Sequence, residues 1–134
     1  MSPRDDLRPE ASPLWLDKAK RNLDSAILND THGGYTDTTC YFCHQTAELA
    51  LKAFVVHYSL DFKKTHDLVE LSQICAQKDA SFEELKGECV FLNPFYISDK
   101  YPMDPPWMPS KELTKEALEA AERVLTLVKK ETGK

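Results

Sequence analysis

The sequence predicts an all-α protein, an up-and-down antiparallel bundle of four main helices plus a short fifth. Three observations support this fold class. Apolar residues recur at helical spacing in several segments, no segment shows the alternation of a strand, and the connections are short, which favours antiparallel neighbours. With 134 residues, the chain is expected to form a single domain over residues 12–131, after a flexible tail at residues 1–11.

The first helix is predicted from Pro13 to about Asn29. Ser12 followed by proline is a typical N-cap and first helical position, and the paired glycines at positions 33 and 34 indicate the turn that follows. The residues expected to face the core are Leu16, Ala19, Leu23, Ala26 and Ile27.

A second helix, from near Asp37 to about Tyr58, is predicted to lie at the centre of the core because apolar residues occupy most of its circumference. Its polar side chains fall in one narrow stripe when the residues are placed about 100° apart. The stripe consists of Tyr41, Gln45, Glu48 and Lys52, with His44 on its flank. We therefore expect this helix to supply the floor of a site as well, facing either a ligand or a second subunit.

Three shorter patterns complete the bundle. Thr65 is expected to cap a third helix, whose inward residues are Leu68, Leu71, Ile74 and Cys75. A capping box of Ser81 and Glu84 is expected to open a fourth helix that ends near Asn93. After a proline-rich stretch, Ser110 is expected to cap the last helix, whose inward residues are Leu113, Ala117, Ala120, Val124 and Leu127.

Composition limits the function classes. The formal net charge of -5 argues against broad electrostatic binding to nucleic acid. No apolar run is long enough for a membrane span, and the N-terminus lacks the apolar region of a signal peptide, so a cytoplasmic location is expected. In that compartment the four cysteines are expected to be reduced thiols.

The segment from Cys40 to His44 is a C-x-x-C-H string, the attachment pattern of c-type haem. Haem attachment normally accompanies export, and no export signal is present, so we expect no haem. A structural zinc site needs four ligands, usually two close pairs, and Cys75 and Cys89 lie far apart in the sequence. The thiols are expected to pack as small hydrophobic groups, with no metal.

Three polar groups are candidates for a binding site. Glu48 and Lys52 have the spacing of a helix ion pair, which would be solvated on a plain surface. The lysines before His66 would lie at a helix N-terminus, where an anion could bind or a simple cap could form. Tyr96 belongs to a third group with Lys100 and Tyr101, which either packs the bundle end or stacks on a base and meets a phosphate.

Three segments together resemble the HEPN domain family. The first, CHQTAELALKAF, resembles the family's central A-E-x-A-L-K-A helix; the second, Thr-His-Asp-Leu from Thr65, resembles its T-H-x-L helix start. The third, Tyr96–Pro102, resembles its tyrosine-then-R-Y-P segment, and the resemblance extends from Leu14 to Val128. The resemblance implies a helical bundle that often dimerises and acts beside a minimal nucleotidyltransferase.

Other branches of the family are metal-independent ribonucleases with an R-x4-6-H motif at the dimer interface. This chain departs from that pattern, because none of its arginines is followed by a histidine at that spacing. Lys100 stands where the family has an arginine before Tyr-Pro, and lysine lacks the planar, bidentate fork of arginine.

We therefore expect a non-catalytic HEPN module that needs no cofactor and binds a nucleotide or nucleic acid. The resemblance implies that it acts as a homodimer with a partner nucleotidyltransferase. The residues expected at the ligand are Gln45, Glu48, Lys52, Lys64, His66, Tyr96, Lys100 and Tyr101. Two alternatives stay open: a ribonuclease toxin with a degenerate site, in which His66 is the acid–base group, and a purely structural dimeric bundle.

Overall fold

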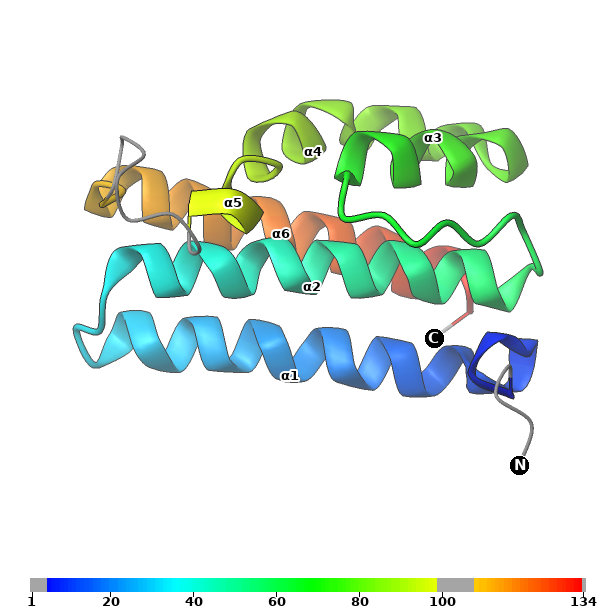
Figure 1. Ribbon diagram of the computed structural model, residues 1–134, viewed down its shortest axis with the longest axis horizontal. Coiled ribbons are helices and arrows are strands. Elements are labelled where there is room, and N and C mark those ends of the chain that lie inside the picture. Colours follow the sequence, from blue (N-terminus) through cyan, green and yellow to red (C-terminus); the bar gives the residue numbers. More distant parts are fainter. Residues whose placement is uncertain (1–4, 99–107, 134) are drawn as a thin grey trace.

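In the computed structural model, which describes residues 5–98 and 108–133, the helical bundle predicted from the sequence is confirmed. Helix α1 (Ser12–Thr31) runs antiparallel to α2 (Thr36–His57), and α6 (Lys111–Glu131) packs along α2 and also contacts α1 (Figure 1). A second layer covers these helices. It contains α3 (Leu68–Lys78), the 3-10 helix η3 (Ala80–Leu85) and α4 (Lys86–Leu92), and it leads to the short α5 (Phe95–Ser98).

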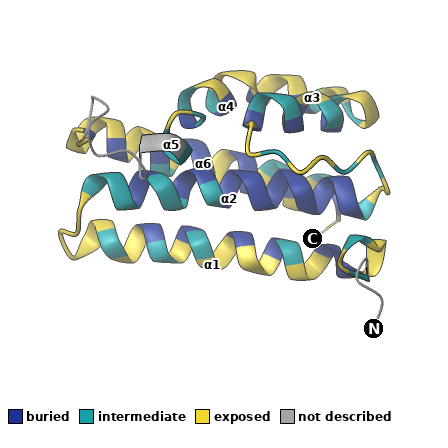
Figure 2. Cartoon of the chain, viewed as in Figure 1, coloured by how far each residue is buried: buried dark blue, intermediate teal, exposed yellow. Residues whose placement is uncertain are grey.

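Helix α2 is the centre of the core, as its composition predicted. Fifteen of its 22 residues are buried, whereas the outer face of α1 is exposed (Figure 2). The hydroxyl of Tyr58, which follows α2, donates a hydrogen bond to the backbone carbonyl of Glu131 at 3.0 Å. The neighbouring ends of α2 and α6 are therefore held together.

The start of α1 differs from the prediction. Residues before it form two 3-10 helices, η1 (Asp5–Leu7) and η2 (Pro9–Ala11). Ser12 is the first residue of α1 rather than its N-cap, and its hydroxyl donates to the backbone carbonyl of Ala53 on α2 at 2.8 Å. The prediction of Ser12 as an N-cap is therefore wrong, because sequence spacing does not reveal a hydrogen-bond partner 41 residues away.

Two other caps were also assigned to the wrong residues. Asp67, not Thr65, caps α3, and its carboxylate accepts from the backbone N–H groups of Val69 and Glu70. Asp79 caps η3 in place of the predicted capping box, and it accepts from the backbone N–H of Ser81. The cap predicted for the last helix is confirmed, because Ser110 accepts from the backbone N–H of Leu113 at 3.1 Å.

The inward faces of the helices agree with the periodicity except near helix ends. Ile27 is 44% exposed and Leu113 is 37% exposed, although both were expected in the core. Each lies in the last or first turns of its long helix. Among the described residues, no helix is long and apolar enough to cross a membrane.

Helix α2 ends in a backbone motif that redirects the chain. The N–H of Leu60 donates to the carbonyl of Val55, and the N–H of Ser59 donates to that of Val56, which together form a Schellman motif. Ser59 has a φ of 53°, in the left-handed region usually occupied by glycine. Residues 60–67 then run back along α2 without regular structure to the start of α3 (Figure 1).

Candidate functional site

The polar stripe of α2 is covered by the chain's own segment 59–67. Glu48 is 4% exposed and Lys52 is 7% exposed, and their side chains form an ion pair in which Lys52 Nζ lies 2.8 Å from Glu48 Oε2. The ammonium group also lies 5.6 Å from the ring centroid of Phe62, in the covering segment. The interpretation of this pair as a solvated surface ion pair is therefore wrong.

His66 connects the segment to the buried carboxylate. Its Nδ1 donates to Glu48 Oε1 at 2.9 Å, while its side chain is 50% exposed. Glu48 thus receives one donor on each oxygen, from His66 and from Lys52. This arrangement fixes the orientation of the imidazole ring.

His44 supports His66 from inside the core. Its Nε2 donates to the backbone carbonyl of His66 at 3.0 Å, and its Nδ1 lies 3.9 Å from Glu48 Oε1. Burial lowers the pKa of His44, so the imidazole remains neutral at neutral pH. His44 was placed on the flank of the stripe but was not predicted as a site residue.

Tyr96 brings a third segment, α5, to the same place. Its ring stacks on the ring of His66, with centroids 4.1 Å apart and an interplanar angle of 16°. It also contacts the ring of His44, at 5.4 Å and a tilt of 39°. A half-exposed, nearly parallel aromatic pair is therefore supported by a buried polar network formed by α2.

The sequence left two alternatives at the N-terminus of α3, an anion site or a simple cap, and the structure shows the cap, because protein side chains occupy the N–H donors of the first turn. Asp67 accepts from two N–H groups of the first turn, and Asn93 Oδ1 accepts from the N–H of Leu68 at 2.8 Å. Asn93 Nδ2 in turn donates to Asp67 at 2.9 Å, and this bond is the main cause of the lowered pKa of Asp67. The bridge from Asn93 was missed because the two residues are 26 positions apart.

The sequence also predicted four other residues at the site, namely Gln45, Lys64, Lys100 and Tyr101. Gln45 is partly buried, and its Oε1 lies 3.4 Å from His44 Nδ1. Lys64 is exposed and makes no ion pair with any residue that the structure describes, whereas its neighbour Lys63 pairs with Asp61 at 3.3 Å. Lys100 and Tyr101 lie outside the described residues.

The C-x-x-C-H string contributes core packing. Cys40 and Cys43 are fully buried, and Cys40 lies in contact with Thr114 of α6. Burial raises the pKa of Cys40 to about 11, which keeps the thiol protonated. Within residues 5–98 and 108–133, no group of three or more metal-ligating side chains is arranged to hold a metal ion.

Comparisons with known proteins agree with this architecture. The chain is similar to the archaeal HEPN homologue ST0689, with a TM-score of 0.71, 24% identity, and coverage of 93% of this chain and 98% of that chain. It is also similar to TT1696 from Thermus thermophilus, with a TM-score of 0.73, 26% identity, and coverage of 89% and 96%. No curated protein sequence gave a significant match.

The family comparison covers the whole bundle. The model of the HEPN domain matches residues 12–131, which include every helix from α1 to α6. The matched range also contains the segment that covers α2, so the whole polar cluster lies within the match. The chain therefore belongs to the HEPN domain family.

Proposed function

We propose that this HEPN domain is a non-catalytic module that binds a nucleotide or a nucleic-acid end. The observation that carries the proposal is the His66–Tyr96 pair, which combines a nearly parallel stack with a half-exposed imidazole. Stacking on aromatic rings is a sequence-tolerant way to hold a base, because every base presents a flat π-face.

The roles of the surrounding residues follow from their exposure. Lys64 is exposed beside His66 and is the described cation best suited to meet a phosphate. His66 Nε2 would hydrogen-bond a base or a sugar hydroxyl. Glu48 and Lys52 are too buried to meet a ligand directly, so they act by holding His66 in place.

The assembly is part of the same proposal. We infer a homodimer that acts with a partner nucleotidyltransferase, as the family resemblance implies. Sedimentation of the purified chain tests the dimer, and co-purification from the native host followed by identification of a nucleotidyltransferase tests the partner. A monomer at all concentrations, or no such partner, would contradict this part without affecting the binding site.

Thermal melting in the presence of nucleotides and short single-stranded RNA tests the binding site. A ligand with a Kd of about 0.1 mM, added at about 1 mM, stabilises the folded state by about 1.4 kcal/mol. This corresponds to a rise in Tm of about 3 to 5 °C for a domain of this size.

Two variants test whether the rise in Tm comes from ligand binding near His66. Lys64→Ala should reduce the rise in Tm, because it removes the exposed charge beside His66. Lys20→Ala is the matched control, since Lys20 is an exposed lysine on α1, away from the stacked pair. An unchanged Tm with every ligand, or equal losses in the two variants, would contradict the assignment.

A second function is favoured by one specific observation. The bond from His66 Nδ1 to a buried carboxylate orients the ring, as a general acid–base histidine requires. In this second function the protein is a ribonuclease, and His66 is its acid–base group. The test is RNA cleavage by the wild type and by two folded variants. If His66→Ala abolishes cleavage and Lys20→Ala does not, this function is established and the non-catalytic one is overturned.

A further inference from the structure

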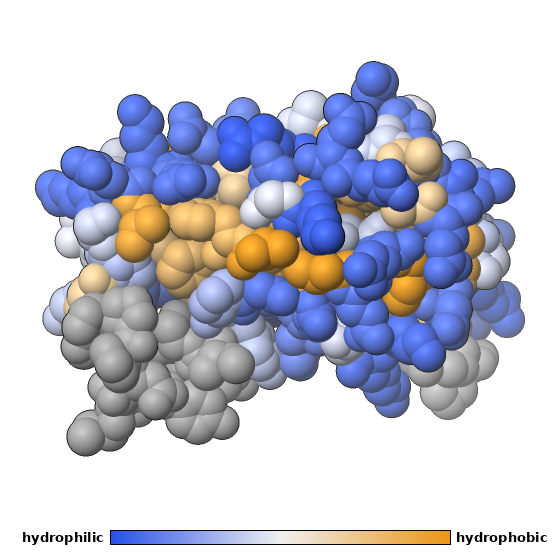
Figure 3. Space-filling model, turned by 90° about the horizontal axis from the view of Figure 1, so that it is seen from above, coloured by the Kyte–Doolittle hydropathy of each residue, from blue (hydrophilic) through white to orange (hydrophobic). Residues whose placement is uncertain are grey.

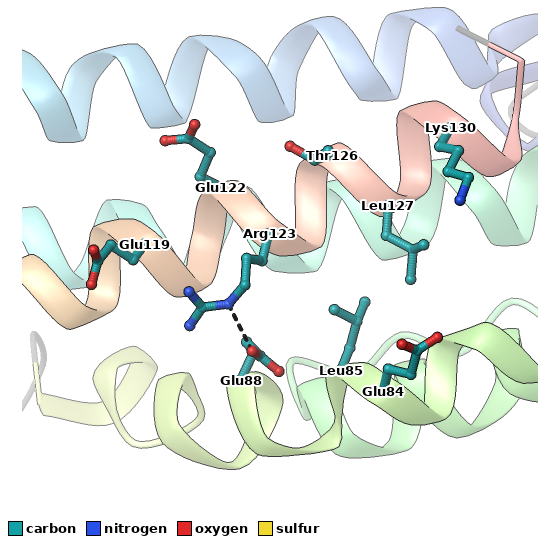
Figure 4. A pocket seen from close by; sticks show the side chains of 9 residues that line it. All are labelled: Glu84, Leu85, Glu88, Glu119, Glu122, Arg123, Thr126, Leu127 and Lys130. Carbon is teal, nitrogen blue, oxygen red and sulfur yellow. Dashed lines mark hydrogen bonds and ion pairs between the residues drawn. The ribbon is translucent and has the colours of Figure 1, made fainter.

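A groove separate from the polar cluster lies between α6 and the η3–α4 layer. Its larger part has a volume of about 630 Å³ and is lined by residues from Glu84 to Glu88 on one side and from Glu119 to Lys130 on the other (Figure 4). A smaller cavity of about 270 Å³ continues along the same helices and shares Glu88 and Arg123 with it.

An ion pair bridges the groove where its two parts meet. Arg123 on α6 points toward Glu88 on α4, and Arg123 Nε lies 2.7 Å from Glu88 Oε2 (Figure 4). The Arg123 side chain is 53% exposed, so this bridge lies in contact with solvent and can exchange partners at little cost.

The floor of the groove is apolar. Leu85 and Leu127 face each other from opposite sides of the larger part (Figure 4). Phe91 lines the smaller part. The molecule seen from above has a band of hydrophobic residues between hydrophilic ones (Figure 3). Leu85, Leu127 and Phe91 therefore give the groove an apolar floor.

The borders of the groove are acidic. Its two parts are lined by five glutamates against two basic residues, and one of these basic residues is already paired with Glu88. The glutamates are Glu84, Glu88, Glu116, Glu119 and Glu122. An occupant with positive charge would therefore be attracted, and a basic segment suits this border better than a second copy of the chain, which has a net charge of -5.

The length of the groove indicates what shape of partner fits. On α6 its lining residues extend from Glu116 to Lys130, a distance of about 21 Å along a helix. A partner helix of about 14 residues has the same length, and a helix laid into a groove presents apolar residues at i, i+3, i+4 and i+7. We propose that this groove docks a basic amphipathic helix of a partner protein, with its apolar face on the leucines and its cations on the glutamates.

A designed peptide tests the proposal with the full chain. The probe is a fluorescein-labelled helical peptide of about 14 residues, with leucines at i, i+3, i+4 and i+7 and lysines on the opposite face. One control peptide has the same composition in scrambled order, and a second has glutamates in place of the lysines. Fluorescence anisotropy measures binding, and resonances of the Leu85 and Leu127 methyl groups report its location.

The protein variants are matched in charge. Glu84→Gln with Glu119→Gln neutralises two groove residues, and Glu10→Gln with Glu112→Gln neutralises two exposed glutamates outside the groove. The groove variant should bind the probe about fivefold more weakly, while the control variant should bind it like the wild type. Binding should also weaken as salt rises from about 50 to about 300 mM.

Three results would overturn the proposal. The scrambled or acidic peptide could bind as tightly as the probe, or the two double variants could bind the probe equally. Sedimentation could also show a dimer that only the groove variant dissociates, in which case the occupant is a second copy of the chain. None of these measurements depends on nucleotide binding at His66, so the two proposals fail separately.

Discussion

Replacing Glu48 with glutamine should destabilise the protein strongly, although the two side chains have nearly the same shape. Glu48 is 4% exposed, and its carboxylate is the only charge within 2.8 Å of the Lys52 ammonium among the described residues. Glu48→Gln keeps an oxygen that can accept from His66 but removes the charge that compensates Lys52. The variant therefore leaves a buried cation without its counter-charge.

The expected cost is about 3 kcal/mol, at the lower end of the range for a buried ion pair that loses one partner. The lower end applies because Lys52 keeps its contact with the ring of Phe62, at 5.6 Å from the centroid. Glu48→Gln combined with Lys52→Met should cost at least about 2 kcal/mol less than the sum of the two single changes.

Urea unfolding of the four proteins, followed by circular dichroism, measures these free energies. The matched control is Asp17→Asn, because Asp17 and Arg21 have the same i, i+4 spacing, but their side chains are 63% and 69% exposed. That change should cost less than about 0.5 kcal/mol. If Glu48→Gln costs no more than Asp17→Asn, the buried network around Glu48 does not exist.

Three further outcomes are expected. Burial lowers the pKa of His44 below 6.5, so the folded protein binds fewer protons at this residue than the unfolded chain does. The free energy of unfolding should therefore fall as the pH drops from about 6.5 to the folded-state pKa of His44, and urea titrations should show a smaller fall of this free energy in His44→Gln. The buried thiols, with the pKa of Cys40 and of Cys89 raised to about 11, should resist a thiol reagent at about pH 8 until the protein unfolds, and rapid labelling of the native state would contradict their burial. Ser59→Gly should raise the free energy of unfolding by about 0.5 to 1 kcal/mol, because glycine adopts the positive φ of this residue without strain. Thermal melting measures this change, and a loss of stability would contradict the Schellman assignment.

The helices and the central role of α2 were predictable from the sequence because they depend on local periodicity. Ten of the fifteen buried residues in α2 are apolar, and their run can be read directly from the sequence. The last helix was predicted with its cap, since Ser110 and its partner Leu113 are three residues apart. Helical periodicity and the cap at Ser110 are therefore accessible without a structure.

The site was predicted only in part, because its geometry depends on distant residues. The stripe of Glu48 and Lys52 was visible, but its cover was not, since His66 lies 18 positions from Glu48. The cap of α3 shows the same limit at shorter range. Aspartate is as good an N-cap as threonine, and sequence preference alone did not distinguish Asp67 from Thr65.

A nucleotide titration followed by amide resonances tests the central claim most directly. The claim is that ligand binds where segment 59–67 meets Tyr96. Addition of nucleoside monophosphates or a short single-stranded RNA should shift the amides of Lys64 and His66 and that of Tyr96, and should leave those of α1 unchanged. An absence of shifts at millimolar ligand, or shifts confined to other surfaces, would contradict the assignment of this site.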